Sequence, residues 1–264
     1  MMMMSRVEEY LELLFPEPRC ELNYNSDYEL LIAIMLSAQS TDKRVNMVMP
    51  VLLKEYPTLI DLKKAELSVL ENIIRPVGSF RRKSVYVKEI ARRLVDEFDS
   101  VVPTDRVILE SFPGIGRKTV NVFLSEFYDI PAIAVDTHVE RVSKRLGFAK
   151  NNDNVLLIEK KLMKKFSKDV WARRHLQLVL FGRYHCKAVK PECSNCLLVD
   201  ICKEKKKNLW LILLLCCWRY FRRRRWWRWN FRRRRWRNIR FIISFWFIIS
   251  LRLIISFWFI FFFF

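Results

Sequence analysis

Apolar residues recur along the first 208 residues with the spacing of α-helices. Tyr86, Ile90, Leu94 and Phe98 follow one another at every fourth position, and a second run with spacings of three and four covers residues 155–166. This period places apolar side chains on one helical face. Runs that alternate with period two, as half-buried strands do, are absent from the sequence. The pattern predicts an all-α fold with short connections.

Residues 28–38 are almost continuously apolar and predict a buried helix. Ser26 precedes this run and Glu29 follows three positions later, which is the capping-box pattern of a helix start. Gly147 follows another helical pattern as a C-cap would. Only 5 glycines occur in 264 residues, too few for a sheet with many tight hairpins. Prolines separate the predicted helices, at positions 50, 57, 76, 103 and 131.

The composition changes sharply at Leu209. Residues 209–264 contain 13 arginines and eight of the nine tryptophans, but no Lys, Asp, Glu, Gly, Pro or Ala. The segment Phe-Arg-Arg-Arg-Arg-Trp occurs at 221–226 and again at 231–236. Such bias and repetition are untypical of a packed domain, so we expect residues 206–264 to lie outside the fold.

Three interpretations of this tail are open. Its repeats indicate repetitive coding DNA, which favours translation out of frame or past a stop codon. Residues 241–264 are long enough to cross a bilayer, but Arg252 lies near their middle, so we expect no membrane contact. A nucleic-acid-binding arm is the third interpretation. None of them assigns a function to the protein.

Charge and cysteine content narrow the functional classes. The chain has 48 Lys and Arg against 28 Asp and Glu, a net charge of +20, which excludes an acidic surface. Four of the seven cysteines fall within residues 186–202, which favours a metal or cluster site over a secreted disulfide scaffold. The N-terminus passes directly into acidic residues without the apolar core of a signal peptide, so export is not expected.

The segment Phe112–Thr119, Phe-Pro-Gly-Ile-Gly-Arg-Lys-Thr, lies between two apolar runs and predicts two helices joined by a tight turn. Gly114 and Gly116 let the backbone turn and leave space, so N–H groups at the start of the second helix can face a phosphate. This contact recognises the nucleic-acid backbone and not its sequence. An ordinary interhelical turn with Arg117 and Lys118 in solvent is the alternative.

Lys118 is expected in the first turn of the second helix, where the helix dipole disfavours a positive charge. The neighbouring Arg117 and partial burial would act in the same direction and favour a neutral amine that attacks an electrophilic carbon. Most lysines are exposed, so a phosphate-binding or merely solvated Lys118 is the alternative.

Asp136 stands where an apolar segment ends and a helical pattern begins. An Asp in this position is most often the N-cap of the helix. The same carboxylate could stabilise a developing sugar cation or assist a proton transfer, because capping and catalysis are compatible. We interpret His138, two residues later, as a structural hydrogen-bonding side chain.

Cys186, Cys193, Cys196 and Cys202 form the pattern C-x6-C-x2-C-x5-C. Four thiolates within 17 residues can bind a single ion or cluster. A four-cysteine zinc site is the alternative, but the six-residue gap is wider than zinc sites usually have. The spacing therefore favours an iron–sulfur cluster.

These motifs, in this order, resemble the endonuclease III family of helix-hairpin-helix DNA glycosylases. The resemblance extends from about Leu11 to Lys205 and includes Leu36–Asp42, Leu-Ser-Ala-Gln-Ser-Thr-Asp. It implies a two-domain fold, with a six-helix domain at residues 22–132 and a cluster domain formed by residues 1–21 and 133–205. The family removes oxidised pyrimidines from duplex DNA and then cuts the strand 3′ to the abasic site.

The resemblance also implies residue roles. Lys118 corresponds to the nucleophile that forms a Schiff base, and Asp136 to the essential carboxylate. Gln39 matches a residue that fills the gap left by the flipped nucleotide, and the cysteines bind a [4Fe–4S] cluster with a structural role. Further DNA contacts are expected from the hairpin and the first cysteine loop, at Gly114, Gly116, Arg117, Thr119, Lys187 and Lys190.

The implied partner is duplex DNA that contains an oxidised pyrimidine or an abasic site. We expect a monomer without an obligate protein partner, located in the cytoplasm at the nucleoid. One position departs from the family, because Ser79 stands where relatives often have a bulky apolar wedge, and Phe80 is a candidate substitute.

Two alternatives belong to other functional classes. An adenine glycosylase shares the cysteine pattern and the aspartate but typically lacks the hairpin lysine, so Lys118 opposes it. A cluster-stabilised DNA-binding module would use the hairpin for phosphates alone. Trapping of a covalent adduct distinguishes the enzyme from the binding module.

Overall fold

The computed structural model describes residues 2–209, which belong to one compact unit of the chain. All regular elements in this part are helical, which confirms the predicted all-α class. No helix among these residues is both long and apolar enough to span a membrane. Of the predicted tail, residues 206–264, the structure describes only residues 206–209, and the interpretations of the remainder lie outside the described part.

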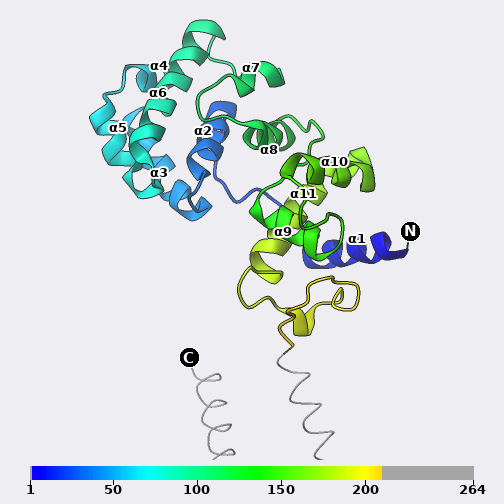
Figure 1. The fold of residues 1–264 in the computed structure, drawn as a ribbon. Coiled ribbons are helices and arrows are strands. Elements are labelled where there is room, and N and C mark those ends of the chain that lie inside the picture. Colours follow the sequence, from blue (N-terminus) through cyan, green and yellow to red (C-terminus); the bar gives the residue numbers. More distant parts are fainter. Residues whose placement is uncertain (1, 210–264) are drawn as a thin grey trace, which may run out of the picture. The chain divides into compact units, whose positions relative to one another are not determined.

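The helices follow one another with short connections (Figure 1). The α-helices are α1 (Met2–Leu14), α2 (Asp27–Ser37), α3 (Asp42–Glu55), α4 (Leu59–Lys64), α5 (Leu67–Ile74), α6 (Phe80–Glu97), α7 (Arg106–Glu110), α8 (Arg117–Phe127), α9 (Thr137–Arg145), α10 (Val155–Lys165) and α11 (Trp171–Leu180). Three short 3-10 helices are η1 (Arg75–Val77), η2 (Lys168–Val170) and η4 (Cys193–Asn195), and η3 (Phe181–His185) is a π-helix.

A first hydrophobic core surrounds α2. Residues Glu29–Leu36 of this helix are buried on every side, as the continuous apolar run predicts. α3, α6 and α8 pack against α2, and α4 and α5 pack against α6 (Figure 1). The core residues all come from the segment between Leu22 and Leu124.

A second core joins the N-terminal helix to the C-terminal half of the described chain. Val7 and Leu11 of α1 are fully buried there. Their neighbours in this core come from the segment before α9 and from α9, α10, α11 and η3 (Figure 1). The segment that leads to Asp136 and the cysteine segment therefore pack against the same core.

The predicted capping box at α2 is wrong in detail. Ser26 is the N-cap residue, but its hydroxyl makes no capping bond and has no partner. Glu29 instead accepts a hydrogen bond from the backbone N–H of Asn25 at 2.8 Å. Glu29 therefore bonds the residue before the N-cap and not the N-cap itself, and the reciprocal bonds of the box do not form. Gly147, by contrast, has φ +75° just after α9, as predicted for a helix end.

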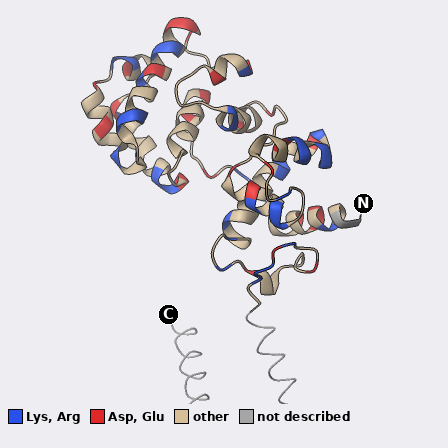
Figure 2. Ribbon diagram, in the orientation of Figure 1, with Lys and Arg blue, Asp and Glu red and all other residues tan. Residues whose placement is uncertain are grey.

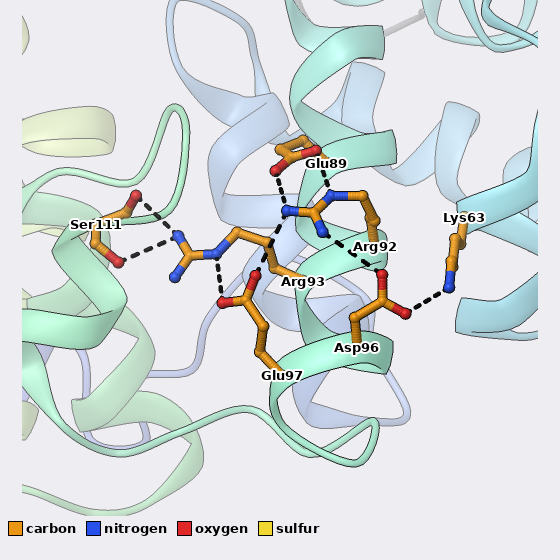
Figure 3. A network of polar contacts seen from close by, with 7 residues as sticks. All are labelled: Lys63, Glu89, Arg92, Arg93, Asp96, Glu97 and Ser111. Atoms are coloured by element: carbon orange, nitrogen blue, oxygen red, sulfur yellow. Dashed lines mark hydrogen bonds and ion pairs between the residues drawn. The ribbon is translucent and has the colours of Figure 1, made fainter.

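Charged residues on α6 connect this helix to its neighbours. Figure 3 shows Arg92 bonded to acidic side chains of α6, one of which, Asp96, also pairs with Lys63 of α4. Arg93 donates to the carbonyl and hydroxyl of Ser111 at 3.0 and 3.2 Å. Its guanidinium also lies 4.3 Å from the centre of the Phe112 ring. These contacts hold Ser111 and Phe112 against α6. Both residues lie at the start of the turn that contains Gly114 and Gly116, called the glycine turn below.

Candidate active site at the helical hairpin

The glycine turn connects α7 and α8 as the sequence predicts. Phe112 and Ile115 are buried and anchor the turn in the first core. Gly114 has φ +77°, and a Cβ there would lie 2.5 Å from Tyr86 and 3.2 Å from Met35. Both the backbone angle and the space therefore require glycine. Gly116 is the N-cap of α8, has open space around it, and supplies no capping side chain. The first N–H groups of α8 are accessible to an anion.

Arg117, the first residue of α8, is held by Glu159 of α10. Its Nε and Nη2 donate to the two carboxylate oxygens at 3.0 and 2.7 Å. The Glu159 side chain is only 4% exposed, whereas that of Arg117 is 46% exposed. This hydrogen-bonded pair raises the pKa of Arg117. Sequence reasoning missed Glu159, since it lies 42 residues away.

Lys118 and Asp136 line one cavity of about 90 Å³. Lys118 is the second residue of α8 and is exposed, so the partial burial expected from the sequence is not found. Asp136 is the N-cap of α9, and its Oδ1 accepts from the N–H of Val139 at 2.7 Å. The capping interpretation of Asp136 is therefore confirmed. The same residue still lies at the cavity wall.

His175 of α11 lines the same cavity and has no counterpart in the sequence predictions. It is 4% exposed, and its Nδ1 is buried without a hydrogen-bond partner. Burial lowers the pKa of His175 to about 4, with the Asp136 charge opposing and the Lys118 charge assisting this shift. A neutral imidazole therefore stands beside the lysine and the aspartate at neutral pH. A single His within an amphipathic helix carries no local signal that could have identified it.

Two charged residues form another part of the cavity wall. Arg183 of η3 donates from Nη1 to Asp42 of α3 at 2.7 Å, and also pairs with Glu21. Burial lowers the pKa of Arg183, but the two carboxylates outweigh it and the pKa is raised overall. The pair with Asp42 connects α3, which packs in the first core, to the π-helix η3, which precedes Cys186.

His138 and the two arginines of α9, Arg141 and Arg145, support the cysteine segment. Arg141 lies 3.2 Å from His138 Nδ1 and donates to the carbonyl of Gly182 at 2.6 Å. This agrees with the structural role predicted for His138. Arg145 donates to the Cys186 sulfur at 3.4 Å and to the carbonyl of Lys187 at 2.8 Å.

The four predicted cysteine ligands line a single cavity, together with apolar side chains. All five cysteines among the described residues are free thiols. In residues 2–209 no three Cys, His, Asp or Glu side chains gather around a point as for one bound ion. Cysteine thiolates are the ligands that iron–sulfur clusters use, so the donor set of this cavity fits such a group by its chemistry.

The remaining predicted DNA-contact residues lie at the surface. Gln39 is exposed in the loop between α2 and α3, Thr119 is half-buried on α8, and Lys190 is exposed in the cysteine loop. Lys187 pairs with Glu192 at 2.7 Å. Basic residues occur on the helices around both hydrophobic cores, and several lie on α10 (Figure 2).

A hollow beside α9 is lined largely by basic residues. It lies next to the chain that follows the last cysteine. The basic residues are Arg141, Lys144, Arg145, Lys150, Lys203, Lys205 and Lys206.

Phe80, the candidate substitute for the apolar wedge, lies at the start of α6. Its side chain is half-buried against the first core, with the guanidinium groups of Arg81 and Arg75 at 5.5 and 6.0 Å from its ring centre. Ser79, by contrast, is exposed and has φ +49°.

Comparison with known proteins identifies the family of this chain. Residues 32–168 match the family described as HhH-GPD superfamily base excision DNA repair protein. Endonuclease III of Bacillus subtilis (strain 168) is 43% identical over 194 residues, which is 74% of this chain and 89% of that protein. Endonuclease III of Escherichia coli (strain K12) is 39% identical over 192 residues, 73% of this chain and 90% of that protein.

Solved structures give the same result. The structure of a trapped endonuclease III–DNA covalent intermediate matches with a TM-score of 0.73 and 44% identity, over 76% of this chain and 96% of that one. The chain therefore belongs to the endonuclease III family within the HhH-GPD superfamily of base excision DNA repair proteins.

Proposed function

We propose that this chain removes oxidised pyrimidines from duplex DNA and cleaves the strand 3′ to the resulting abasic site by β-elimination. Membership of the endonuclease III family makes it a DNA glycosylase and AP lyase. The observation that carries the residue assignment is the shared cavity of Lys118 and Asp136, next to the open N-terminus of α8.

The cavity requires the damaged nucleotide to leave the base stack. Neither Lys118 nor Asp136 could reach the sugar C1′ inside a duplex, so the nucleotide must be turned out toward them. Unstacking costs about a few kcal/mol and is least costly for a poorly stacked lesion, which contributes to selection of damage.

Lys118 acts as the nucleophile. Its amine nitrogen attacks C1′, the bond from C1′ to the base breaks, and the base leaves with that electron pair and takes up the proton that the amine releases. The nitrogen lone pair then forms a C=N bond as the C1′–O4′ bond breaks and O4′ takes up a proton, which opens the sugar ring. Loss of the C2′ proton breaks the C3′–O bond, the 3′ phosphate leaves with that electron pair, and the strand is cut. Asp136 stabilises the positive charge that develops on the sugar. The neutral His175 adds no competing cation to the cavity.

The hairpin and the surface residues hold the DNA backbone. Backbone N–H groups at Gly114, Gly116 and Thr119 bind a phosphate, because the α8 N-terminus favours an anion. Arg117 contributes charge from its ion pair with Glu159. Gln39 fills the gap in the duplex, and two lysines of the cysteine loop, Lys187 and Lys190, contact phosphates.

The four cysteines would hold a [4Fe–4S] cluster, which keeps the cysteine loop in shape. Support comes from their spacing, their common cavity and the Arg145 hydrogen bond to Cys186. Visible absorbance and iron analysis of the purified protein test this, and a colourless protein with one zinc per chain would contradict it.

The two hydrophobic cores suggest two domains. We assign residues 22–132 to the hairpin-containing domain, and residues 1–21 and 133–205 to the cysteine-containing domain. The protein acts as a monomer on duplex DNA, in the cytoplasm at the nucleoid.

A panel of duplexes, each with one oxidised pyrimidine, tests the proposed function. Base release, strand cleavage and borohydride-trapped adduct are measured for the wild type, Lys118→Ala, and the exposed surface control Lys64→Ala. We expect lesion-dependent release and an adduct for the wild type and the control, and no adduct for Lys118→Ala. Binding to abasic duplex without an adduct from the wild type would support a DNA-binding module instead.

A further inference from the structure

Lys83 is a buried lysine whose ammonium group joins two separate loops. The residue lies in the first turns of α6 and is 5% exposed. Its Nζ donates hydrogen bonds to three backbone carbonyls, those of Leu36 at 2.9 Å, Ala38 at 2.7 Å and Val77 at 2.8 Å. All three donor positions of the ammonium are used.

The three carbonyls belong to the ends of two elements. Leu36 and Ala38 lie at the C-terminus of α2, where helical carbonyls lack partners and a cation is favoured. Val77 ends η1 on the other side of the lysine. Lys83 thus connects the chain just before Gln39 with the chain just before Ser79.

Gln39 and Ser79 share an unusual backbone conformation. Their φ angles are +56° and +49°, in the left-handed region that side chains other than glycine rarely adopt. Both residues are exposed. Such conformations persist only when the surrounding contacts hold them, and the bonds from Lys83 lie one and two residues away.

Burial of the lysine is a cost that a purely apolar side chain would avoid. Burial lowers the pKa of the Lys83 ammonium. Methionine has a similar length and would fill the space without a charge, so its absence here indicates a need for the three hydrogen bonds.

We propose that Lys83 is a positioning residue that holds Gln39 and Ser79 as one rigid pair, which enters the duplex where the damaged nucleotide leaves. The inference rests on the proposed function and extends it to a residue that touches neither the sugar nor the base. Phe80 is packed against the core, so the inserting surface consists of these two exposed polar residues.

Lys83→Met tests the proposal, with Lys88→Met on the same helix as the matched control. Borohydride trapping is measured with one abasic oligonucleotide, used as a duplex and as a single strand. A single strand has no opposite partner and no gap to fill. We expect Lys83→Met to reduce the trapping rate on duplex by about tenfold or more, since small misplacements are costly, and on single strand by less than about twofold.

A second measurement uses Gln39→Ala alone and combined with Lys83→Met. If Lys83 acts through Gln39, the double variant on duplex is no slower than the slower single variant. Should Lys83→Met fail to fold, Lys83→Gln keeps two N–H donors and serves in the same assays.

Several outcomes would overturn the inference. An equal loss on duplex and single strand indicates general destabilisation, and an unchanged duplex rate shows that the bonds are dispensable. Either result, obtained while the wild type still forms an adduct, leaves the proposed function intact. A wild type that forms no adduct with either DNA overturns the proposed function and this inference with it.

Discussion

Asp136 is both a helix cap and a residue of the cavity wall. Its carboxylate caps α9 through Val139 and also faces the cavity of Lys118. The sequence predicted both residues because their signals are local, an N-cap position and a glycine turn. His175 and Lys83 carried no local signal, since their importance depends on partners that folding brings near. The predicted burial of Lys118 was wrong because the N-terminus of α8 projects from the core.

Asp136→Asn separates the two purposes. Asparagine caps a helix about as well as aspartate, so we expect the melting temperature to change little. Loss of the negative charge should reduce single-turnover base release by about 100-fold. Asp105→Asn is the matched control, because Asp105 caps α7 through Ile108 at 2.9 Å and lies outside the cavity. A full rate for Asp136→Asn would refute its catalytic assignment.

His175 makes stability depend on pH. Its pKa is about 4 in the folded protein and 6.5 when unfolded, so the unfolded chain binds the proton more tightly. This contribution to stability is complete above pH 6.5 and is lost as pH falls toward 4, by about 3 kcal/mol in total. Urea unfolding at pH 4.5 and pH 7 checks it. His175→Leu should show a smaller difference between the two pH values than the wild type, and an equal difference would contradict the buried neutral imidazole.

At the scale of elements, the contacts that place the hairpin come from distant segments. The sequence of α7 and α8 predicts the hairpin, but other helices hold the turn between them. Arg93 of α6 bonds Ser111 where the turn begins, and Glu159 of α10 bonds Arg117 where it ends. Helical periodicity predicted α6 and α10 as elements. Periodicity could not predict that charged residues of α6 and α10 bond to the hairpin, because a charged residue on a helix surface can pair with many partners. The failed capping box before α2 has a similar origin, since Asn25 supplies a competing N–H.

Arg117→Gln tests the tie between α8 and α10. The substitution leaves the buried Glu159 carboxylate without its bidentate partner, which should cost about 2 kcal/mol of unfolding free energy. Urea denaturation measures this. Arg19→Gln is the control, because Arg19 and Glu17 pair in solvent with side chains 82% and 77% exposed. Equal stability of the two variants would show that the buried pair contributes nothing.

On the scale of the whole molecule, the net charge of +20 overstates the charge available to DNA. The arginine-rich tail contributes 13 positive charges, and within the described residues other basic side chains, such as Arg92, Arg173 and Arg183, are already paired with acids. The all-α class and the order of the motifs followed from the sequence, since both depend on local patterns. The distribution of free and paired basic side chains did not, because it depends on tertiary contacts.

Binding to an abasic-analogue duplex should weaken as salt rises, through release of counterions from the contacted phosphates. Lys190→Ala should lower the slope of log K against log salt by about 1, the value for one phosphate contact. Lys64→Ala, on the outer face of α4, should leave it unchanged. Fluorescence anisotropy between 50 and 200 mM salt, about the range where such effects are large, measures both. An unchanged slope for Lys190→Ala would remove this residue from the DNA interface.

The identity of the nucleophile is tested most directly by mapping the trapped adduct. Wild-type protein is reacted with an abasic duplex and borohydride, the DNA and protein are digested, and the modified peptide is sequenced by mass spectrometry. We expect the sugar remnant on the side-chain nitrogen of Lys118. A remnant on another amine, or strand cleavage without any remnant, would contradict the account.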